Sequence, residues 1–358
     1  MKKIVSIIGA RPQFIKASPI HNEIQKRFNL VSIHTGQHYD NNLSDVFFRQ
    51  FKLKKPDYNC KIGSGNHGEQ SGKMLIEIEK ILIKEKPQLI IIYGDTNSTL
   101  SGVIAASKLH IPTAHIEAGM RSFNRHMPEE VNRVIADHLS ELNFCVNKNA
   151  SQNLKNEGIH QGIHIVGDTM YDVFHKLKKS INKKVLNTFK LDPGDYILTT
   201  IHRSSNTENK ESLNSIVKAL ININENFVIP LHPRTKKYLL KYDLYSKLIN
   251  SDNIHIIPPQ GYVENLSLMY YSKKILTDSG GMQKEAYFMK KPCITMREET
   301  EWIETLNIGQ NTLVGNDTKK IIKAIQQTPI TFKNKKIFGG GNSASKIIKI
   351  ISDFLKSN

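Results

Sequence analysis

The chain has 358 residues, of which 39% are hydrophobic and 23% charged, and its formal net charge is +17. Such a length exceeds one ordinary hydrophobic core and favours two domains. The basic excess raises the question of nucleic-acid binding, but 41 of the 50 basic residues are lysines scattered through amphipathic segments. They do not alternate with aromatic residues, so the pattern is typical of a solvated surface, and we expect no nucleic-acid partner.

The sequence also contains no membrane or metal signal. The basic start and the apolar run that ends at Gly9 are shorter than a signal peptide or a membrane span, and the other apolar runs have the length of strands. Cys60, Cys145 and Cys293 lie far apart without metal-ligand spacing. We therefore expect a cytoplasmic protein in a reducing compartment, with no metal site and with buried cysteines.

The first half of the chain alternates between strand and helix patterns. An apolar run over residues 3–8 predicts a strand, and Pro12 near the start of the next segment predicts a helix over 12–28. Further strands are expected over residues 30–35, 88–94, 113–119, 143–147 and 163–167, and helices over 70–86, 98–110, 128–140 and 151–158. Because no hairpin signals separate the strands, this order predicts a parallel sheet with helices on both faces.

The same alternation restarts after a polar connection that ends near Asp195. Strands are expected over residues 196–202, 227–232, 254–258, 274–280, 293–296 and 311–315, and helices over 211–223, 263–272, 281–289 and 343–355. The fold class is therefore α/β, with two Rossmann-like doubly wound domains. We expect a ligand crevice between them, at the carboxyl ends of both sheets.

Two groups of charged residues follow early strands. Arg11 lies at a strand–helix turn and Lys16 one turn further on, a pair that suits a diphosphate, although Arg11 could instead cap or pair structurally. The turn lacks the GxGxxG pattern of a tightly bound dinucleotide. Asp95 directly follows the strand over 88–94, where an aspartate is as often the N-cap of the next helix.

A third group of charges is the stretch HIEAGMRSFNRHMPEEVNR, residues 115–133. Glu117 ends a strand, and the glycine that follows lets the chain turn away, so its carboxylate should face the crevice. Glu129 and Glu130 begin a helix, where acidic residues also favour the helix dipole, so a helix-start role is the alternative. Arg133 lies one turn further and can pair with either of them.

The second half places histidines, arginines and small residues after its strands. His202 and Arg203 follow one strand, and His232 and Arg234 follow the next. Residues 279–281, Ser-Gly-Gly, suit a phosphate cradle of backbone N–H groups, with an ordinary tight turn as the alternative. Glu285 would then accept hydrogen bonds from ribose hydroxyls. These features together indicate an enzyme of nucleotide sugars that uses no metal or redox cofactor.

The motifs occur in a recognisable order. They are GARPQFIK, TGQHYD, YGDTNST, HIEAGMRSF with PEEVNR, TIHRSSNTEN, LHPRT, GYVENL, TDSGGMQKEA and MREETEW. In this order the chain resembles the non-hydrolysing UDP-N-acetylglucosamine 2-epimerase family from Lys3 to about Gly315. The resemblance implies a glycosyltransferase-B type fold with domains at residues 1–168 and 169–340, and a helix at 341–358 that crosses back to the first domain. It also implies a homodimer that needs no cofactor.

The resemblance further implies a mechanism and a set of site residues. The family eliminates UDP across C1–C2 of the sugar to give a 2-acetamidoglycal, and adds UDP back with the proton delivered to the other face. The expected catalytic residues are Asp95, Glu117, Glu129 and His202. The expected contacts of the UDP-sugar are Arg11, Lys16, Arg121, Arg203, His232, Arg234, Tyr262, Ser279, Gly280, Gly281, Glu285 and Arg297.

One departure from the family bears on the substrate. Residues 37–43 read QHYDNNL where members acting on UDP-N-acetylglucosamine commonly read QHREML, which puts allosteric activation by substrate in doubt. The motif wording is closer to the branch acting on UDP-2,3-diacetamido-2,3-dideoxy-glucuronate for surface polysaccharides, whose carboxylate needs a cation such as Arg121, Arg125 or Lys16. The alternatives are a UDP-sugar glycosyltransferase of the same fold and a hydrolysing epimerase.

Overall fold

The computed structural model describes residues 1–37, 51, 53–327 and 336–357. The chain forms two compact units: the first unit comprises Met1–Lys176 with Lys336–Asn358, and the second unit comprises Leu177–Lys335. The sequence placed the boundaries at 168–169 and 340–341. Residues around both positions are tied together inside the first unit, because the Asp172 carboxylate accepts hydrogen bonds from the backbone N–H groups of Ser343 and Ala344 at 3.0 and 2.8 Å.

The first unit contains a seven-stranded sheet in the order β3-β2-β1-β4-β5-β6-β7, paired in parallel throughout. Its strands are β1 (Lys3–Ile8), β2 (Asn29–His34), β3 (Tyr58–Asn59), β4 (Leu89–Tyr93), β5 (Thr113–Ala118), β6 (Leu142–Cys145) and β7 (Ile163–Ile165). Its helices are α1 (Arg11–Ile24), α3 (His67–Glu85), α4 (Asn97–Lys108), α5 (Pro128–His138), α6 (Lys148–Asn156), α7 (Thr169–Leu177) and α17 (Ser343–Ser357). The strand order reverses between β1 and β4, where open α/β sheets bind ligands.

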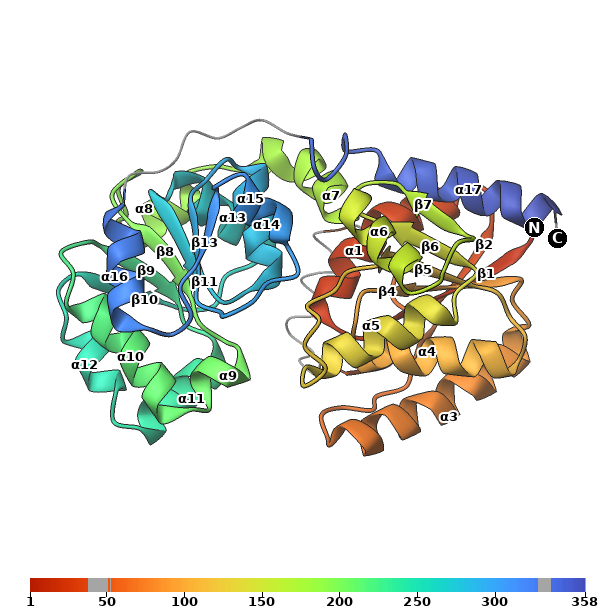
Figure 1. Cartoon of the computed structure of the whole chain (residues 1–358), viewed down its shortest axis with the longest axis horizontal. Helices are drawn as coiled ribbons and strands as arrows, with labels where there is room; N and C mark the ends of the chain where they lie inside the picture. The colour runs from red at the N-terminus through yellow and green to blue at the C-terminus, as the bar shows by residue number, and fades with distance from the viewer. Residues whose placement is uncertain (38–50, 52, 328–335, 358) are drawn as a thin grey trace. The chain divides into compact units, whose positions relative to one another are not determined.

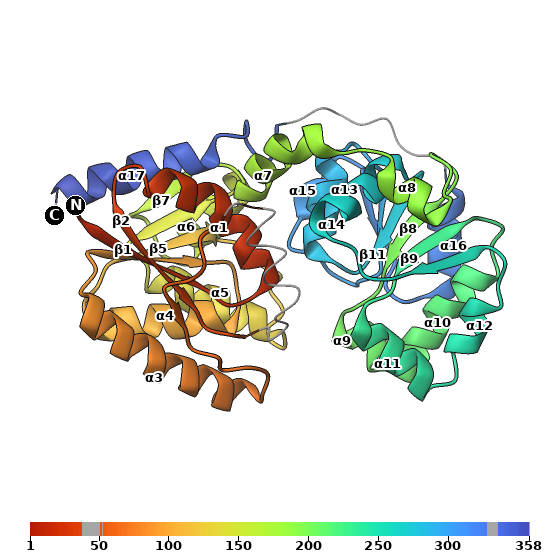
Figure 2. The same ribbon diagram turned by 180° about the vertical axis from the view of Figure 1, so that it is seen from behind.

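Helices cover both faces of this sheet. Helices α3, α4 and α5 lie on one face, and α1 with α17 on the other (Figures 1 and 2). Every residue of β4 is buried, as expected for a central parallel strand covered on both sides. Helix α17 packs against α1 through an apolar stripe that includes Ile347, Ile351 and Leu355. The C-terminal helix therefore belongs to the first unit.

The second unit repeats the architecture with a six-stranded parallel sheet in the order β10-β9-β8-β11-β12-β13. Its strands are β8 (Ile197–Thr200), β9 (Phe227–Pro230), β10 (Ile254–Ile257), β11 (Lys274–Thr277), β12 (Cys293–Thr295) and β13 (Asn311–Leu313). Its helices are η1 (Lys178–Ser180), α8 (Lys184–Phe189), α9 (Ser204–Thr207), α10 (Lys210–Ile221), α11 (Pro233–Lys241), α12 (Tyr245–Ile249), α13 (Tyr262–Tyr271), α14 (Gly280–Phe288), α15 (Ile303–Asn307) and α16 (Thr318–Gln326). Its order reverses between β8 and β11.

Two apolar cores sandwich the second sheet. One contains residues of α10, α11, α12 and α16, such as Leu213, Leu239 and Ile321. The other contains residues of α8, α13 and α14, such as Leu186, Leu268 and Ala286. The expectation of two Rossmann-like domains of the glycosyltransferase-B type is thus confirmed. The sequence missed α8, because its short apolar content lies inside a charged stretch that was interpreted as a connection.

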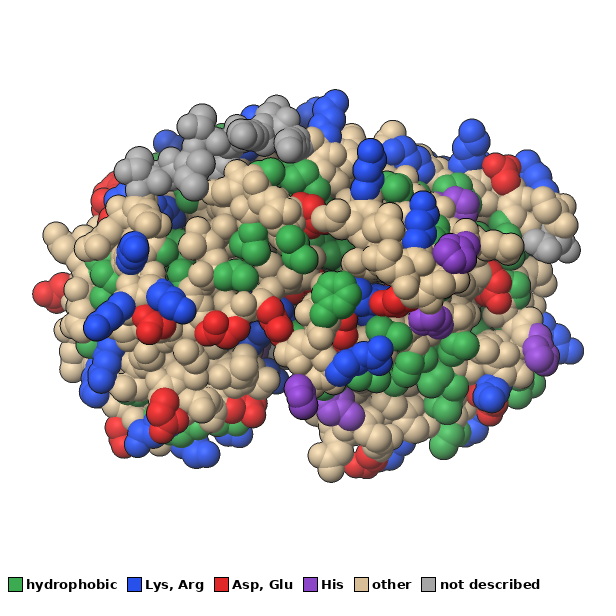
Figure 3. Space-filling model, viewed as in Figure 1, with side chains coloured by type: hydrophobic (Ala, Val, Ile, Leu, Met, Phe, Trp, Pro, Cys, Tyr) green, Lys and Arg blue, Asp and Glu red, His purple; other side chains and the backbone are tan. Residues whose placement is uncertain are grey.

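On the face of the molecule that the space-filling view draws (Figure 3), the cationic residues do not gather in one place. On the face in Figure 3, Lys and Arg side chains are spread among acidic, polar and apolar ones. Several exposed lysines pair with a glutamate one turn away, such as Lys73 with Glu69 and Lys80 with Glu77. This distribution is the solvated surface that the sequence pattern indicates.

A buried histidine joins α1 to the sheet and makes folding sensitive to acid. His21 Nε2 lies 2.7 Å from Ser6 Oγ on β1, and Ser6 Oγ lies 3.0 Å from the Tyr93 hydroxyl on β4. Burial lowers the pKa of His21 from 6.5 to about 4, against the opposing effect of Asp57. The unfolded chain therefore takes up this proton first, so the stabilising effect of the neutral side chain is complete above about pH 6.5 and is lost as the pH falls toward 4.

We expect His21 to account for a loss of about 3 kcal/mol in the free energy of unfolding between pH 7 and pH 4. Urea unfolding of the wild type and of His21→Gln at both pH values measures it. The variant keeps an amide near Ser6 but has no group that titrates there, so its decline should be smaller by that amount. Parallel declines in the two proteins would contradict the prediction.

Candidate active site

The candidate residues of the first unit follow three neighbouring strands. Lys16 lies in α1 after β1, Asp95 follows β4, and Glu117 lies near the end of β5. Because these strands are parallel and adjacent in the order β1-β4-β5, their carboxyl ends lie side by side at the switch point of the sheet.

Lys16 and Glu117 form a buried ion pair. Lys16 Nζ contacts Glu117 Oε2, and the two side chains are only 10% and 9% exposed. Gly94, at the end of β4, lies against this pair: a Cβ there would be 2.9 Å from Lys16 Nζ and 3.5 Å from Glu117 Oε2, and its φ is +61°. The sequence assigned Lys16 to a diphosphate, and the structure gives it a carboxylate partner.

The backbone of Glu117 is in an unusual conformation. Its φ is +72°, in the left-handed region, and the pairing of β5 with β6 shifts register between Ile116 and Ala118. A non-glycine residue in this region costs about 1–3 kcal/mol and persists only where the surrounding structure holds it. Bulges of this kind re-aim a side chain at the end of a strand and are frequent next to active sites.

Asp95 is held by an arginine and is not a helix cap. The N-cap of α4 is Thr96, whose side chain accepts from the Thr99 N–H at 3.4 Å. The Asp95 carboxylate instead accepts from Arg133 at 2.5 Å, and its side chain is 29% exposed. The N-cap alternative for Asp95 is therefore wrong, and its carboxylate lies near the surface of the first unit at the end of β4.

The two glutamates at the start of α5 have different environments. Glu130 is buried and accepts from Ser122 N–H, Ser122 Oγ and Phe123 N–H at 2.8, 2.9 and 3.0 Å, and from Arg133 at 3.0 Å. Glu129 is half-buried in the first turn of the helix. Glu130 thus holds the loop before α5. The sequence allowed Arg133 to pair with either Glu129 or Glu130, and in the structure it pairs with Glu130.

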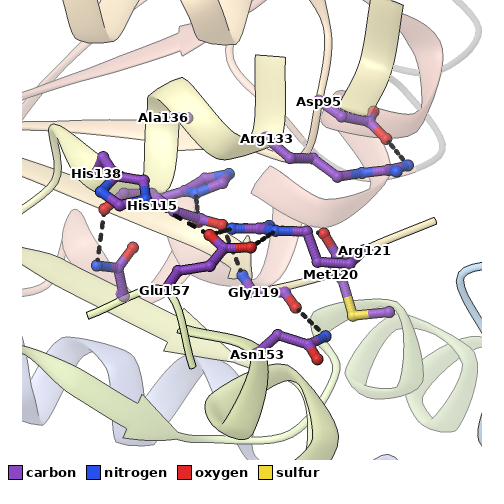
Figure 4. A network of polar contacts seen from close by, with 12 residues as sticks. Asp95, His115, Gly119, Met120, Arg121, Arg133, Ala136, His138, Asn153 and Glu157 are labelled. Atoms are coloured by element: carbon purple, nitrogen blue, oxygen red, sulfur yellow. Dashed lines mark hydrogen bonds and ion pairs between the residues drawn. The ribbon is translucent and has the colours of Figure 1, made fainter. Parts of the chain in front are cut away.

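Arg121 is buried in a network of charges (Figure 4) and is not exposed to a sugar. Its guanidinium donates to Asp137 at 2.6 Å and bidentately to Glu157, with both distances 2.7 Å. Burial alone would lower the pKa of Arg121, but Glu157 and Asp137 raise it above its ordinary value. The expectation that Arg121 binds substrate therefore needs correction, because both sides of its guanidinium are taken by carboxylates. Arg125, in contrast, is exposed.

Two expectations fall on parts that the structure does not describe. The side chain of Arg11, the first residue of α1, is one of them, and residues 38–43 of the QHYDNNL segment are the other. The turn before α1 is described: Gln13 Oε1 accepts from the backbone N–H groups of Gly9 and Ala10 at 2.8 and 3.0 Å. The Gln13 side chain therefore caps the start of α1 and satisfies these two backbone donors.

In the second unit, Asp278 organises the ends of β8 and β11. It is fully buried and accepts from the backbone N–H of His202 at 3.0 and 3.1 Å, from that of Arg203 at 3.0 Å, and from Asn206 at 3.2 Å. The His202 ring, 38% exposed, has Nδ1 3.5 Å from the same carboxylate. Asp278 thus orients His202 at the switch point of the second sheet.

Further candidate residues surround this switch point. Ser279 is the N-cap of α14, and Gly280 and Gly281 are its first residues. A Cβ on Gly280 would lie 2.5 Å from Glu301 Oε1, so this position accommodates only glycine while Glu301 keeps its place. Glu285 lies in the second turn of α14 and is buried. The N-terminus of the nine-residue helix α14 thus lies beside Glu301, which pairs with Arg297 at 2.9 Å.

The other basic candidates differ in exposure. His232 and Arg234 are exposed at the start of α11, where the Arg234 N–H donates to His232 Nδ1 at 3.1 Å and the Arg234 guanidinium donates to the His202 carbonyl at 3.2 Å. Arg203 is half-buried, whereas Tyr262 and Arg297 are buried. The structure therefore brings His202, His232 and Arg234 together, with the two histidine rings 5.8 Å apart.

Neither a metal site nor a membrane span is found in the described parts of the chain. Among these residues no group of three or more His, Cys, Asp or Glu side chains is placed to hold a metal ion. No described helix is long and apolar enough to cross a membrane.

The fold and the strand-end residues define a class of two-domain proteins built like glycosyltransferases of the B type, and comparison with known proteins narrows it. Residues 22–352 match the family model described as UDP-N-acetylglucosamine 2-epimerase. The chain belongs to this family and is an isomerase.

Individual relatives cover nearly the whole chain. A UDP-N-acetylglucosamine 2-epimerase homolog of Methanococcus maripaludis is 51% identical over 98% of this chain and 99% of its own length. A UDP-2,3-diacetamido-2,3-dideoxy-D-glucuronate 2-epimerase of Pseudomonas aeruginosa is 44% identical with the same two coverages. The crystal structure of the Methanocaldococcus jannaschii UDP-GlcNAc 2-epimerase with UDP-GlcNAc and UDP has a TM-score of 0.92 at 45% identity, covering 98% of this chain and 99% of that one.

Proposed function

We propose that the protein is a non-hydrolysing epimerase that inverts C2 of a UDP-N-acetylhexosamine. The observation that carries the proposal is the geometry of Glu117, which is held in a left-handed conformation beside Lys16 at the switch point of the first sheet. Asp95 follows on the neighbouring strand. A carboxylate held in a strained conformation at this edge of a sheet suits proton transfer better than a structural role.

The chemistry requires carboxylates and cations and no redox step. The C2–H of an amido sugar is not adjacent to a carbonyl, so its direct removal is unfavourable. When the C1–O bond breaks, its electron pair leaves with the diphosphate, C1 becomes positive, and the C2 proton passes to a carboxylate as the C1–C2 double bond forms. In the return step a proton adds to the opposite face of C2 and the diphosphate oxygen attacks C1. No water is consumed.

We assign proton transfer to Asp95, Glu117 and Glu129, and the diphosphate and uridine to the second unit. The bound ligands of the Methanocaldococcus jannaschii relative support a UDP-sugar. The start of α14 offers backbone N–H groups for a phosphate. The His202 backbone N–H donates to Asp278, the residue directly before the N-cap Ser279, so His202 lies near this start. The other proposed contacts in this unit are Arg203, His232, Arg234, Tyr262, Ser279, Gly280, Gly281, Glu285 and Arg297.

The identity of the sugar is a finer proposal. Identities of 44% to the diacetamido-glucuronate enzyme and 45% to a UDP-N-acetylglucosamine enzyme do not separate the two substrates. The motif wording favours the uronate, made for a surface polysaccharide. Because Arg121 is buried between two carboxylates and Lys16 pairs with Glu117, Arg125 is the exposed arginine that we assign to the uronate carboxylate. A homodimer is part of the same proposal.

Nuclear magnetic resonance of the purified protein in heavy water tests both levels. UDP-N-acetylglucosamine and the UDP-diacetamido-uronate are incubated in separate tubes without an acceptor. We expect the manno epimer with deuterium at C2, and faster turnover of the uronate. Irreversible release of free sugar and UDP would indicate a hydrolysing enzyme, and unchanged substrate without deuterium would indicate a transferase. Efficient turnover of UDP-N-acetylglucosamine alone would overturn the uronate assignment.

A further inference from the structure

A buried chain of hydrogen bonds links the ends of β4 and β5 through a histidine. His115 lies in β5 with no solvent exposure, two residues before Glu117. Its Nδ1 is 2.7 Å from Asp137 Oδ1 and its Nε2 is 2.8 Å from the Gly94 carbonyl oxygen. The imidazole ring therefore bridges a side chain of α5 and the backbone at the end of β4.

Asp137 is hydrogen-bonded to residues on both sides of Glu117 in the chain. Besides His115 on the N-terminal side, it accepts from the Gly119 N–H at 3.1 Å on the C-terminal side. Its second oxygen also accepts from Arg121 at 2.6 Å. The five-residue segment whose centre is Glu117 is therefore fastened at both ends to one buried carboxylate on α5.

The same carboxylate reaches the strand end that carries Asp95. His115 bonds the carbonyl of Gly94, the residue before Asp95, while the Gly94 N–H donates to the Ile116 carbonyl at 2.9 Å. Gly94 is also the residue against which Lys16 and Glu117 pack. The peptides that carry the two carboxylates are thus connected through the His115 ring.

We infer that Asp137 is a positioning residue that holds Glu117 and Asp95 in place through His115 and the Gly119 N–H. It contacts neither carboxylate itself. The kinetic consequence of this inference rests on the proposed function. The contacts of Asp137 with His115 and with the Gly119 N–H, which we call the clamp, are a property of the fold. Arg121 forms ion pairs with Asp137 and Glu157 in the same network, and the pair with Asp137 requires that Asp137 is ionised.

Glu157 provides a matched control at the outer end of the network. Its carboxylate pairs with the opposite side of Arg121 and lies 3.5 Å from His138, and it does not bond to His115, Gly94 or Gly119. Asp137→Asn and Glu157→Gln each remove one carboxylate charge bonded to Arg121. Only Asp137→Asn also changes the contacts with His115 and the Gly119 N–H that flank Glu117. A role limited to neutralising Arg121 predicts similar effects for both.

The test measures turnover, KM, the affinity for UDP and amide hydrogen exchange in both variants. The measurements are made without urea, at a pH and temperature where each variant is folded. We expect Asp137→Asn to lower kcat about a hundredfold, the loss typical of a misplaced catalytic group, with KM and UDP affinity within about threefold. Exchange at residues 94–96 and 116–119 should rise. Glu157→Gln should keep kcat within about threefold and leave this exchange unchanged.

A third variant covers the case in which Asp137→Asn does not fold. His115→Asn keeps a donor toward Asp137 and loses the bond to Gly94, so kcat should fall about tenfold or more with faster exchange at residues 94–96. Wild-type kcat in a folded Asp137→Asn or His115→Asn, or equal losses in Asp137→Asn and Glu157→Gln, overturns the inference. Absence of epimerisation in the wild type would overturn the proposed function alone. The hydrogen-exchange data would still test whether Asp137 holds residues 94–96 and 116–119 in place.

Discussion

Replacing Glu117 with glutamine is expected to lower turnover by a factor of about 10²–10⁴, the usual contribution of a positioned acid or base. The amide keeps the size of the side chain but cannot take a proton from C2 or return one. Asp95→Asn should show a loss of the same order. In both variants UDP should bind with little change in affinity, since most of the residues proposed to contact it lie in the second unit. Deuterium incorporation at C2 and calorimetric titration with UDP measure the two quantities.

An exposed glutamate serves as the control for these substitutions. The Glu69 carboxylate on α3 pairs with the surface residue Lys73, and Glu69→Gln removes one carboxylate without touching the ends of β4 and β5. We expect its turnover to equal that of the wild type. Near-normal activity in Glu117→Gln or Asp95→Asn would remove that residue from the proton-transfer set, and loss of UDP binding in either would show that the defect is one of folding.

The fold could be predicted largely because parallel strands covered on both faces have a distinctive sequence. β4 is a continuous run of buried Leu, Ile and Tyr, and β1 differs from it only at one half-buried end. The alternation of such runs with amphipathic helices leaves little choice of topology. The short strand β3 and helix α9 were missed because two to four residues carry no periodicity that could be recognised.

The site was predictable where position along the strand decides a role. Asp95 follows one buried strand and Glu117 lies near the end of the next, and that placement alone brought them to one edge of the sheet. Burial of charged side chains was not predictable in the same way, because an arginine in a buried ion pair and an arginine facing a ligand have the same local sequence. Arg121 and Arg125 therefore could not be told apart.

One sequence signal did point to the buried network. Asp137 lies in the last turn of α5, where the helix dipole disfavours a negative charge. An aspartate retained there needs compensating cations, and the structure supplies His115 and Arg121. Although burial would raise it, these two cations hold the pKa of Asp137 below its ordinary value. The signal is visible only when helix end and charge are considered together.

The free energy of unfolding should fall by about 3–5 kcal/mol when Arg121 is replaced by methionine, because the substitution breaks a buried ion pair and leaves Asp137 facing His115 alone. Urea unfolding at pH 7 measures this loss. Arg125→Met is the matched control, an exposed arginine four residues away, and should change stability by no more than about 0.5 kcal/mol. If Arg121 were a sugar contact, its variant would keep normal stability and show only a raised KM.

The pH dependence of the Arg121→Met loss gives a second, independent check. Asp137 has a lowered pKa in the folded protein, so its contribution to stability is present above the pKa of the unfolded chain, about 3.9, and is lost as the pH falls through the lower folded value. Removing Arg121 takes away one of the two cations that depress this pKa. The stability difference between wild type and variant should therefore shrink below about pH 4, whereas a difference that stays constant down to pH 3 would show that lost packing, and not the Arg121–Asp137 pair, causes the effect.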